Sequence, residues 1–306
     1  MDADTLETLR LIEDVLTKIE GAYAANTLRA YKADMLEFNF YCCGLNVCAF
    51  PATPQCIANF VLKVSLDGIK SSTVRRKVSS ISALHRLGNM VDPTKSADVS
   101  LAVRKMHRQL GRHAEQARAV NLPELEQFLT AAGPDLRGHR DRALLLLGYD
   151  TLRRRSELIS LQVDDLEFKA DGTGVILLRK NKTDQDRMGK YLHLSARTCE
   201  ALHEWFKHSE ILSGTILRGV LHGNRVTKSL GEGQISRIYK RIARLAGLDE
   251  KVILEISGHS LRVGAAQDLL KSGASLPQIM VKGGWSKPDT VIRYTEKTLI
   301  ESRQLL

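Results

Sequence analysis

Apolar side chains recur at helical spacing through the first third of this 306-residue chain. Residues 3–21 place leucine, isoleucine or valine every three or four positions, a period that puts them on one face of an α-helix. The same period predicts helices over about 26–43, 56–66 and 97–110. A further helix is expected to open at Ser71 or Ser72, either of which could cap it. An all-helical N-terminal domain is therefore predicted.

The rest of the chain mixes helices with a few strands. Residues 172–194 alternate around a turn-rich middle, which predicts a β-hairpin with its tip near residues 181–186. Residues 140–161 form a strong helical stretch that we expect to be interrupted near Gly148. Other helices are expected over about 196–210, 233–246, 260–272 and 275–282, and a short one should start near Ser286.

The polar segment 111–120 lacks apolar periodicity and is interpreted as a linker between domains. A new helix is expected to begin near Asn121, with Pro123 in its first turn. Because 306 residues favour two domains, we predict a helical domain over 1–110 and a helix-rich domain over 121–306 with a small antiparallel sheet.

Positive charge is concentrated in one part of the chain. The net charge is +10, with −4 over residues 1–62, +8 over residues 63–112 and +6 over the remainder. A basic zone of this kind suits a polyanion such as DNA, although a solvated helix face explains an isolated cluster about equally well. The helix expected from Ser71 could direct a short polar turn at base edges while its cations hold phosphates. The candidate DNA contacts are Ser71, Ser72, Thr73, Arg75, Arg76 and Lys77 on that helix, and Arg104, Lys105 and Arg108 on the next.

Five cysteines form no CxxC pair, and the acidic N-terminus is unlike a secretory leader. No apolar run approaches the roughly 20 residues of a membrane helix. These features predict a protein of a reducing cytoplasm without a membrane partner.

Several residues that suit phosphodiester chemistry are spread over the second domain. His259 and Arg262 share a helical face, and Trp285 and Tyr294 follow them. These four supply an imidazole, an anion-binding guanidinium, an N–H donor and a phenol. Arg154 and Glu157 lie three apart on another helix and can pair. Each residue alone has an ordinary structural explanation, such as a core histidine or a solvated arginine.

A second pattern resembles a zinc-protease motif. His203, Glu204 and His208 follow one another, but the histidines are five residues apart, which turns a helix by roughly 500° and separates the rings. No third ligand is evident in the sequence, so no metal is assigned.

Taken together, the ordered set Arg154, Glu157, Lys182, His259, Arg262, Trp285 and Tyr294 resembles the tyrosine recombinase (phage integrase) family. The similar segments are 151–158, Lys182–Thr183 after a strand, 257–266, and Gly283-Gly284-Trp285 with Tyr294. The resemblance extends over nearly the whole chain and implies a mainly α, two-domain protein that closes as a C-shaped clamp on DNA.

The resemblance also implies a mechanism and a partner. Tyr294 would attack a phosphodiester to give a 3′-phosphotyrosine, with Arg154 and Arg262 on the phosphate oxygens and Lys182 as general acid. His259 and Trp285 would bind the phosphate, Glu157 would orient the site, and neither metal nor cofactor would be needed. The substrate would be double-stranded DNA with short inverted repeats, recombined through a Holliday junction.

Four cleavages require four protomers, so the resemblance implies a tetramer on DNA formed from free monomers in a prokaryotic cytoplasm. The amphipathic tail after Tyr294 is expected to dock on a neighbouring protomer through Ile300 and Leu305 or Leu306. Two alternatives remain open: a type IB topoisomerase-like nicking and closing enzyme, and a catalytically silent sequence-specific DNA-binding protein.

Overall fold

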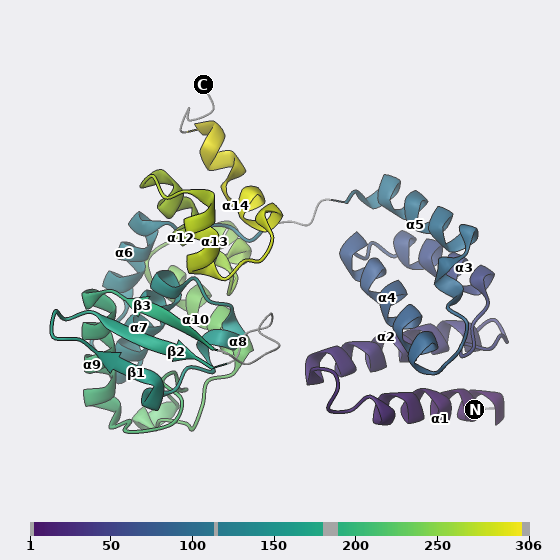
Figure 1. Cartoon of the computed structure of the whole chain (residues 1–306), viewed down its shortest axis with the longest axis horizontal. Coiled ribbons are helices and arrows are strands. Elements are labelled where there is room, and N and C mark those ends of the chain that lie inside the picture. Colours follow the sequence, from purple (N-terminus) through teal and green to yellow (C-terminus); the bar gives the residue numbers. More distant parts are fainter. Residues whose placement is uncertain (1–2, 113–115, 180–188, 302–306) are drawn as a thin grey trace. The chain divides into compact units, whose positions relative to one another are not determined.

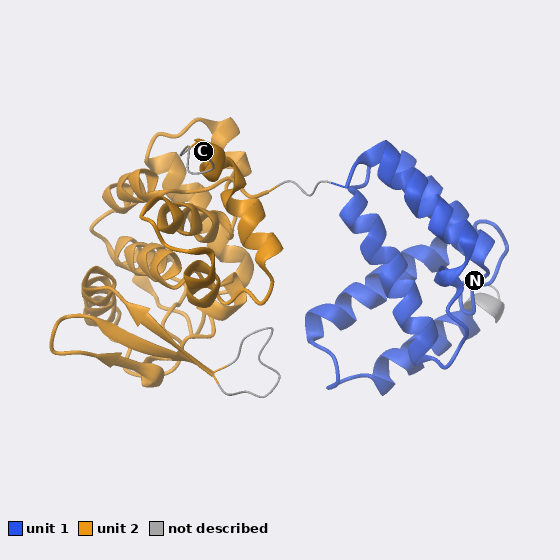
Figure 2. Cartoon of the chain, turned by 45° about the horizontal axis from the view of Figure 1, so that its top comes forward, with its two compact units in different colours: residues 1–115 blue, residues 116–306 orange. Residues whose placement is uncertain are grey.

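The computed structural model describes residues 3–112, 116–179 and 189–301. The chain divides into two compact units, residues 1–115 and 116–306 (Figure 2). The division falls inside the polar segment 111–120. None of the described helices is long and apolar enough to cross a membrane.

Unit 1 is helical throughout its regular structure (Figure 1). Its helices are α1 (Ala3–Lys18), α2 (Ala25–Cys43), α3 (Pro54–Leu66), α4 (Ser71–Leu87) and α5 (Ala97–Leu110), with a 3-10 turn at Pro93–Lys95. Their apolar faces meet in one core that includes Met35, Phe38, Phe60, Ile81 and Met106. The helical periodicity of the sequence is thereby explained, because each stripe supplies one wall of this core.

The starts of these helices differ in chemistry. Thr53 caps α3 and Ser96 caps α5, each accepting a hydrogen bond from a backbone N–H in the first turn. The expected cap of α4 is wrong. Lys70 occupies the capping position and Ser71 is the first helical residue, so no side chain caps this helix.

Unit 2 combines helices with a three-stranded antiparallel sheet, which confirms the predicted fold class. The strands are β1 (Leu166–Phe168), β2 (Gly174–Leu178) and β3 (Lys190–Leu194), in the order β1-β2-β3. In the β2–β3 pair, Ile176 lies opposite Leu192. The predicted hairpin tip at 181–186 lies outside the described residues.

The helices of unit 2 pack mainly on one side of this sheet (Figure 1). They are α6 (Leu122–Ala131), α7 (Leu136–Thr151), α8 (Arg155–Leu158), α9 (Ala196–Ser209), α10 (Glu232–Leu245), α11 (Glu250–Glu255), α12 (Ser260–Lys271), α13 (Leu276–Gly283) and α14 (Pro288–Glu301), with 3-10 turns at Val163–Asp165 and His222–Asn224. The sequence did not predict α11 or β1, because both are short.

The predicted break near Gly148 is also misplaced. α7 continues to Thr151 and ends at Leu152, which adopts a left-handed conformation with φ of 52°. Gly148 stays helical, and a Cβ there would lie 3.1 Å from the hydroxyl of Tyr239. Its glycine is explained by close packing against α10, whereas the real break places three arginines just after α7.

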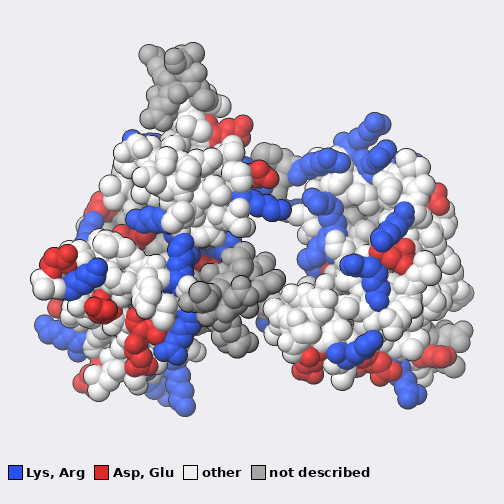
Figure 3. Space-filling view, in the orientation of Figure 1, with Lys and Arg blue, Asp and Glu red and all other residues white. Residues whose placement is uncertain are grey.

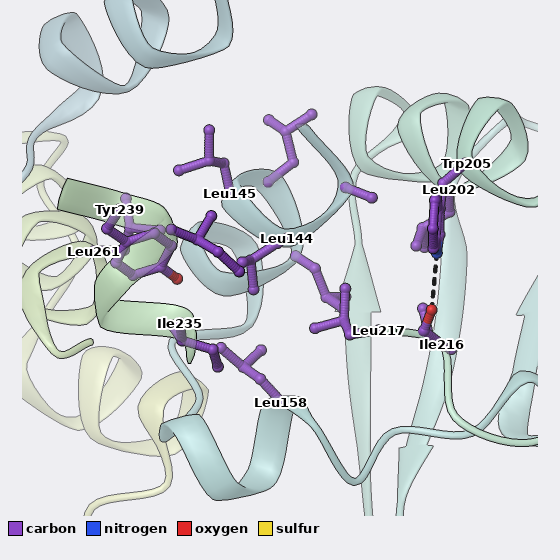
Figure 4. Close-up of a cluster of buried hydrophobic side chains, with 14 of the residues drawn as sticks. Leu144, Leu145, Leu158, Leu202, Trp205, Ile216, Leu217, Ile235, Tyr239 and Leu261 are labelled. Atoms are coloured by element: carbon purple, nitrogen blue, oxygen red, sulfur yellow. Dashed lines mark hydrogen bonds between the residues drawn. The ribbon is translucent and has the colours of Figure 1, made fainter. Parts of the chain in front are cut away.

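The main core of unit 2 is built on α7. Leu144 and Leu145 of this helix pack among Leu202 and Trp205 of α9 and Tyr239 of α10 (Figure 4). The indole of Trp205 donates a hydrogen bond to the carbonyl of Ile216 at 2.8 Å. A second, smaller core contains Leu152, Ala265, Ala266, Ile279, Trp285 and Val291. This smaller core fixes the elements that carry the candidate site.

Candidate active site

Tyr294 and Trp285 lie together on the last two helices and the turn between them. Their rings meet edge to face, with centroids 6.0 Å apart and an interplanar angle of 79°. Trp285 is buried in the smaller core of unit 2, and half-buried Tyr294 packs against that core. The tyrosine is thus held by packing while part of it remains accessible.

The two glycines before Trp285 are required by this arrangement. A Cβ at Gly283 would lie 1.7 Å from a ring carbon of Trp285, so no larger residue fits without movement. Gly284 ends α13 in the left-handed region with φ of 68°. Gly284 thus lets the chain turn at the end of α13, and Gly283 leaves the space in which the indole of Trp285 packs against this helix.

Arg262 of α12 is a buried guanidinium stacked on the same indole. Its Cζ lies 3.9 Å from the centre of the Trp285 ring, and only 2% of the residue is exposed. One terminal nitrogen, Nη1, donates to the carbonyl of Leu152, whereas Nη2 is buried and has no hydrogen-bond partner among the described residues. A buried donor without an acceptor costs free energy that a bound anion would recover.

The electrostatic surroundings of Arg262 are also positive. Burial first, and then the charges of Arg154 and Arg153, lower the pKa of Arg262, while Glu157 and Tyr294 act in the opposite direction. Arg153 and Arg154 are thus near enough to Arg262 for their charges to act on it. An oxyanion at this position would relieve the repulsion and accept hydrogen bonds at the same time.

The three consecutive arginines have three different environments. Arg153 is buried and donates to the carbonyls of Thr151 and Lys282, which joins α7 to α13. The stem of Arg155 packs over Gly258, where a Cβ would meet it at 2.0 Å. Arg154 keeps 27% of its side chain exposed and donates to Glu157 at 2.8 Å. Arg154 and Arg155 are both half-buried, and Arg154 is the one whose guanidinium is oriented by Glu157.

Glu157 is the counter-ion of this group. Its carboxylate is almost fully buried and accepts hydrogen bonds from both the backbone N–H and the guanidinium of Arg154. These two bonds hold the start of α8 and the side chain of Arg154 in one geometry. Its role in the structure is to orient the arginine.

His259 immediately precedes α12, three residues before Arg262. Burial first, and then the charges of Arg155, Arg262 and Arg154, lower the pKa of His259. The imidazole is therefore neutral at physiological pH and can accept a proton. All of the described residues among the predicted catalytic set lie in unit 2 and are connected by contacts or charge interactions.

Lys182 lies outside the described residues. Another lysine, which the sequence did not single out, lies near the arginines: Lys190 at the start of β3 donates to the carbonyl of Val281. Burial and the charge of Arg153 lower the pKa of Lys190, and Glu157 opposes them. Lys190 was missed because a lysine in a strand has no distinguishing spacing, whereas Arg153 was an alternative to Arg154 in the sequence.

The predicted DNA contacts of unit 1 lie on two helices, α4 and α5. On α5, Arg104, Lys105 and Arg108 are exposed. Figure 3 shows Lys and Arg side chains distributed over this unit. On α4, Arg75 and Ser72 are exposed and Thr73 is half-buried.

Lys77 and Ser71 do not fit the predicted role in contacting DNA. Lys77 is 4% exposed and its ammonium pairs with Glu37, with Asp34 at 3.9 Å. Arg76 is 46% exposed in its side chain and donates to Asp34 at 2.5 Å. The basic triplet is therefore partly used to hold α4 against α2, and burial removes Lys77 and Ser71 from contact with solvent.

A separate group of histidine and carboxylate side chains in unit 2 lies apart from the residues around Arg262. Within the described ranges, one group of three such residues comes close enough to hold a metal ion, namely His139 of α7 with Glu204 and His208 of α9. None of these three belongs to the group around Arg262.

Comparison with known proteins places the chain in one family. Residues 118–299 match the sequence pattern of the Phage integrase family. The chain is 30% identical over 291 residues to the integrase/recombinase xerD homolog of Selenomonas ruminantium, an alignment that covers 92% of this chain and 84% of that protein. It is 27% identical over 261 residues to recombinase cre of Escherichia phage P1, covering 80% and 76% of the two chains.

The fold is similar to that of a recombinase solved on DNA. The XerH site-specific recombinase bound to palindromic difH substrate, in a post-cleavage complex, superposes with a TM-score of 0.68 and 19% sequence identity. The alignment covers 96% of this chain and 82% of that chain. At this identity the likeness concerns the fold.

Proposed function

The chain belongs to the phage integrase family of tyrosine recombinases, and from this premise we propose that it cuts and rejoins double-stranded DNA at specific sites through Tyr294. The observation that carries the proposal is the buried guanidinium of Arg262, whose Nη2 has no partner among the described residues and which lies beside Trp285 and Tyr294. A phosphodiester oxygen is an acceptor of the right charge for this donor.

The first chemical step is the attack of the Tyr294 oxygen on phosphorus. The P–O bond to Tyr294 forms as the P–O5′ bond breaks, which gives a 3′-phosphotyrosine and a 5′-hydroxyl. Arg154 and Arg262 bind the non-bridging oxygens and stabilise the charge that grows on them in the transition state. The covalent bond retains the energy needed for rejoining the strand.

Two protons move during this step. Neutral His259 accepts the phenolic proton of Tyr294, a role that its lowered pKa suits, and the resulting imidazolium hydrogen-bonds the phosphate. Lys182 gives a proton to the leaving O5′. The indole N–H of Trp285 binds the phosphate, and Glu157 keeps Arg154 in position. The sequence of bond changes needs no metal ion or cofactor.

Recombination between two sites needs four such cleavages. We infer that four protomers assemble on two DNA sites with short inverted repeats, and that the strands exchange through a Holliday junction. Free protomers are monomeric on this proposal, and the segment from Ile300 onward docks on a neighbour. Ile300 is 65% exposed, whereas Leu305 and Leu306 lie outside the described residues. Unit 1 supplies DNA contacts through exposed Arg104, Lys105 and Arg108.

A nicked DNA substrate tests the proposal. The binding sequence is first selected from a random DNA pool, and a nick is then placed so that the strand segment beyond the cut diffuses away. Wild-type protein should become covalently attached to the DNA and migrate as a larger band on a denaturing gel. Tyr294→Phe should bind the same DNA without forming the adduct.

The other outcomes separate the alternative functions. If wild-type protein binds the selected DNA and forms no adduct, the proposed catalysis is wrong and the chain is a binding protein. If an adduct forms and supercoiled DNA is relaxed without exchange between two sites, a topoisomerase-like activity replaces recombination. Exchange of flanking markers between two sites supports the proposal.

A further inference from the structure

Two helices of unit 2 bring together a set of ligands far from Tyr294. α7 and α9 pack against each other, and Figure 1 shows both beside the sheet. His139 lies in the first turns of α7, whereas Glu204 and His208 lie one turn apart on α9. The rings of His139 and His208 stack with centroids 4.1 Å apart and planes inclined by 18°.

The ligand atoms of this trio already converge. Each residue offers one nitrogen or carboxylate oxygen, and these atoms all lie within 4.8 Å of one another. The Nε2 of His208 is 3.4 Å from a carboxylate oxygen of Glu204. Around a tetrahedral zinc ion with bonds of about 2.0–2.2 Å, neighbouring ligand atoms are about 3.3 Å apart. Because the two rings are stacked, one of them must turn so that both nitrogen lone pairs point at the ion, and this rotation brings the three ligand atoms into one coordination sphere.

The donor set favours a particular class of ion. Two imidazoles and one carboxylate suit zinc and similar transition metals, whereas calcium and magnesium prefer oxygen ligands. His139 and Glu204 are half-buried and His208 is exposed, so the site is both shaped and reachable from solvent. A cavity of about 330 Å³ is lined in part by His139 and Glu204 and offers room for a water molecule as fourth ligand.

Nearby cations must be compatible with such an ion. The Nη2 of Arg142 lies 3.5 Å from Nδ1 of His139, but its Nη1 donates to the carbonyls of Ala132 and Gly133 at 2.6 and 3.0 Å. Lys207 reaches Glu204 at 3.7 Å with a side chain that is 70% exposed, so it can move into solvent. The guanidinium of Arg142 is thus held by the two carbonyls, and the ammonium of Lys207 can leave Glu204 when an ion binds. Neither cation needs to occupy the position of the ion.

We propose that His139, Glu204 and His208 bind one zinc-like divalent transition-metal ion that fastens the beginning of α7 to the end of α9. The sequence hid this site because the histidine pair at five-residue spacing, His203 and His208, cannot share an ion. The usable pair is Glu204 with His208 at four-residue spacing, and the third ligand comes from a different helix.

The ion at this site is structural. His139 and Thr151 are twelve residues apart on α7, which corresponds to about 18 Å along the helix. Arg154 follows the far end of this helix, so the ion does not touch the phosphate-binding residues. Binding should raise the stability of unit 2 by mass action without taking part in DNA cleavage.

Metal titration of the full chain tests this inference. After treatment with a chelator, the protein is titrated with ZnCl₂ in a calorimeter, and MgCl₂ serves as the ion that should not bind. Wild-type protein should bind zinc at this site and show a higher Tm with zinc than without. Because even outer-shell changes cost about 10–100-fold in metal affinity, His208→Ala should lose at least about 10-fold.

The matched control is His193→Ala, which removes an exposed histidine on β3. His193→Ala should bind zinc with the affinity of the wild-type protein. Because all three proteins keep the same cysteines, any zinc bound by thiols is the same in each and does not affect the comparison of their affinities. Because His208 is exposed, His208→Ala and the wild-type protein should have the same Tm in the absence of metal. Equal zinc affinity in wild-type and His208→Ala proteins, or absence of zinc binding by the wild-type protein, overturns the inference. Neither result bears on the DNA chemistry of Tyr294.

Discussion

Lys77 in unit 1 and Arg262 in unit 2 are both buried cations, at 4% and 2% exposure, and they are buried in opposite ways. Lys77 is enclosed by carboxylates, because its ammonium pairs with Glu37 and approaches Asp34. Arg262 is surrounded by other guanidiniums and keeps one nitrogen without a partner among the described residues. A buried charge with its counter-ion joins two helices, whereas a buried charge without one marks a place for an anion.

This difference changes how the basic residues of the chain are interpreted. The sequence presents Arg75, Arg76 and Lys77 as one cationic cluster, yet α2 neutralises two of the three through Asp34 and Glu37. In unit 2, Glu157 is the acidic residue that opposes the positive charge on Arg262. The excess positive charge at Arg262 is what a phosphodiester would compensate.

Replacing Arg262 should produce the largest effect. Arg262→Gln removes the charge and the fork of donors, and loss of one transition-state donor costs about 10²–10³-fold in rate. The rate of covalent adduct formation on nicked DNA should fall by at least this factor. The Tm should stay equal or rise, because an uncompensated buried charge is removed.

Far-UV circular dichroism of the same variant is the control for folding, because Arg262 is itself proposed to bind the phosphate and its replacement can also weaken DNA binding. A fall in Tm by several degrees together with an unchanged cleavage rate would contradict the comparison, because it would make Arg262 a structural cation like Lys77.

Replacing Lys77 should have the converse result. Lys77→Met keeps most of the side-chain volume but leaves Glu37 and Asp34 without this cation, which should reduce the free energy of unfolding by about 1–3 kcal/mol. Urea denaturation measures the change. Lys63→Met is the matched control, because Lys63 forms an exposed pair with Asp67 and should cost at most about 1 kcal/mol.

DNA affinity separates Lys77 from the exposed cations of the same unit. Below its denaturation midpoint, Lys77→Met should bind DNA as the wild-type protein does. Weaker DNA binding by a fully folded Lys77→Met protein would show that Lys77 leaves its carboxylates to contact phosphate.

The exposed arginines of α5 should affect DNA binding by a smaller factor. Arg104 and Arg108 are one turn apart and exposed, and each phosphate contact contributes about 0.9 to the slope of log K against log salt. The double change Arg104→Ala and Arg108→Ala should therefore lower this slope by about 2. Fluorescence anisotropy with a DNA duplex over a range of salt concentrations measures it.

Lys32→Ala is the control for this measurement, because Lys32 pairs with Glu13 on the surface of α1 and α2. Its slope should equal that of the wild-type protein. An unchanged slope in the double variant would remove α5 from the proposed DNA contacts.

Much of this organisation follows from local patterns in the sequence. Helical spacing predicts the elements of unit 1 because each helix buries one stripe, and alternation predicts β2 and β3 because one face of the sheet is buried. The resemblance of their order along the chain to the tyrosine recombinase family is what groups Arg154, Arg262 and Tyr294 into one site.

Other features depend on contacts between residues that are distant in sequence. The helix break at Leu152 and the buried pair of Lys77 with Glu37 depend on packing that no local period records. The grouping of His139 with Glu204 and His208 likewise needs α7 and α9 to be placed side by side. Lys182 lies outside the described residues, so its proposed role as general acid stays a prediction.

A finer test concerns the crowding of cations around His259. Burial, followed by Arg155, lowers the pKa of His259 below its ordinary value of 6.5. The native state therefore binds fewer protons at His259 than the unfolded chain does. The stability gained from the neutral imidazole is present above about pH 6.5 and is lost as the pH falls. Adduct formation should likewise persist below pH 6.5 and decline only when His259 becomes protonated.

Arg155→Met should shift this acid limb toward higher pH, because it removes the strongest repulsive charge while keeping an apolar stem over Gly258. Arg237→Met, an exposed change on α10, should leave the limb where it is in the wild-type protein. Adduct formation on nicked DNA, followed from pH 5 to 8 in the range where histidine titrates, gives the midpoints. A limb that does not move in Arg155→Met would mean that another group controls it. A shift toward lower pH would show that Arg155 favours the protonated imidazole. The contrast with Lys77 would then fail, because it requires the cations of unit 2 to repel one another.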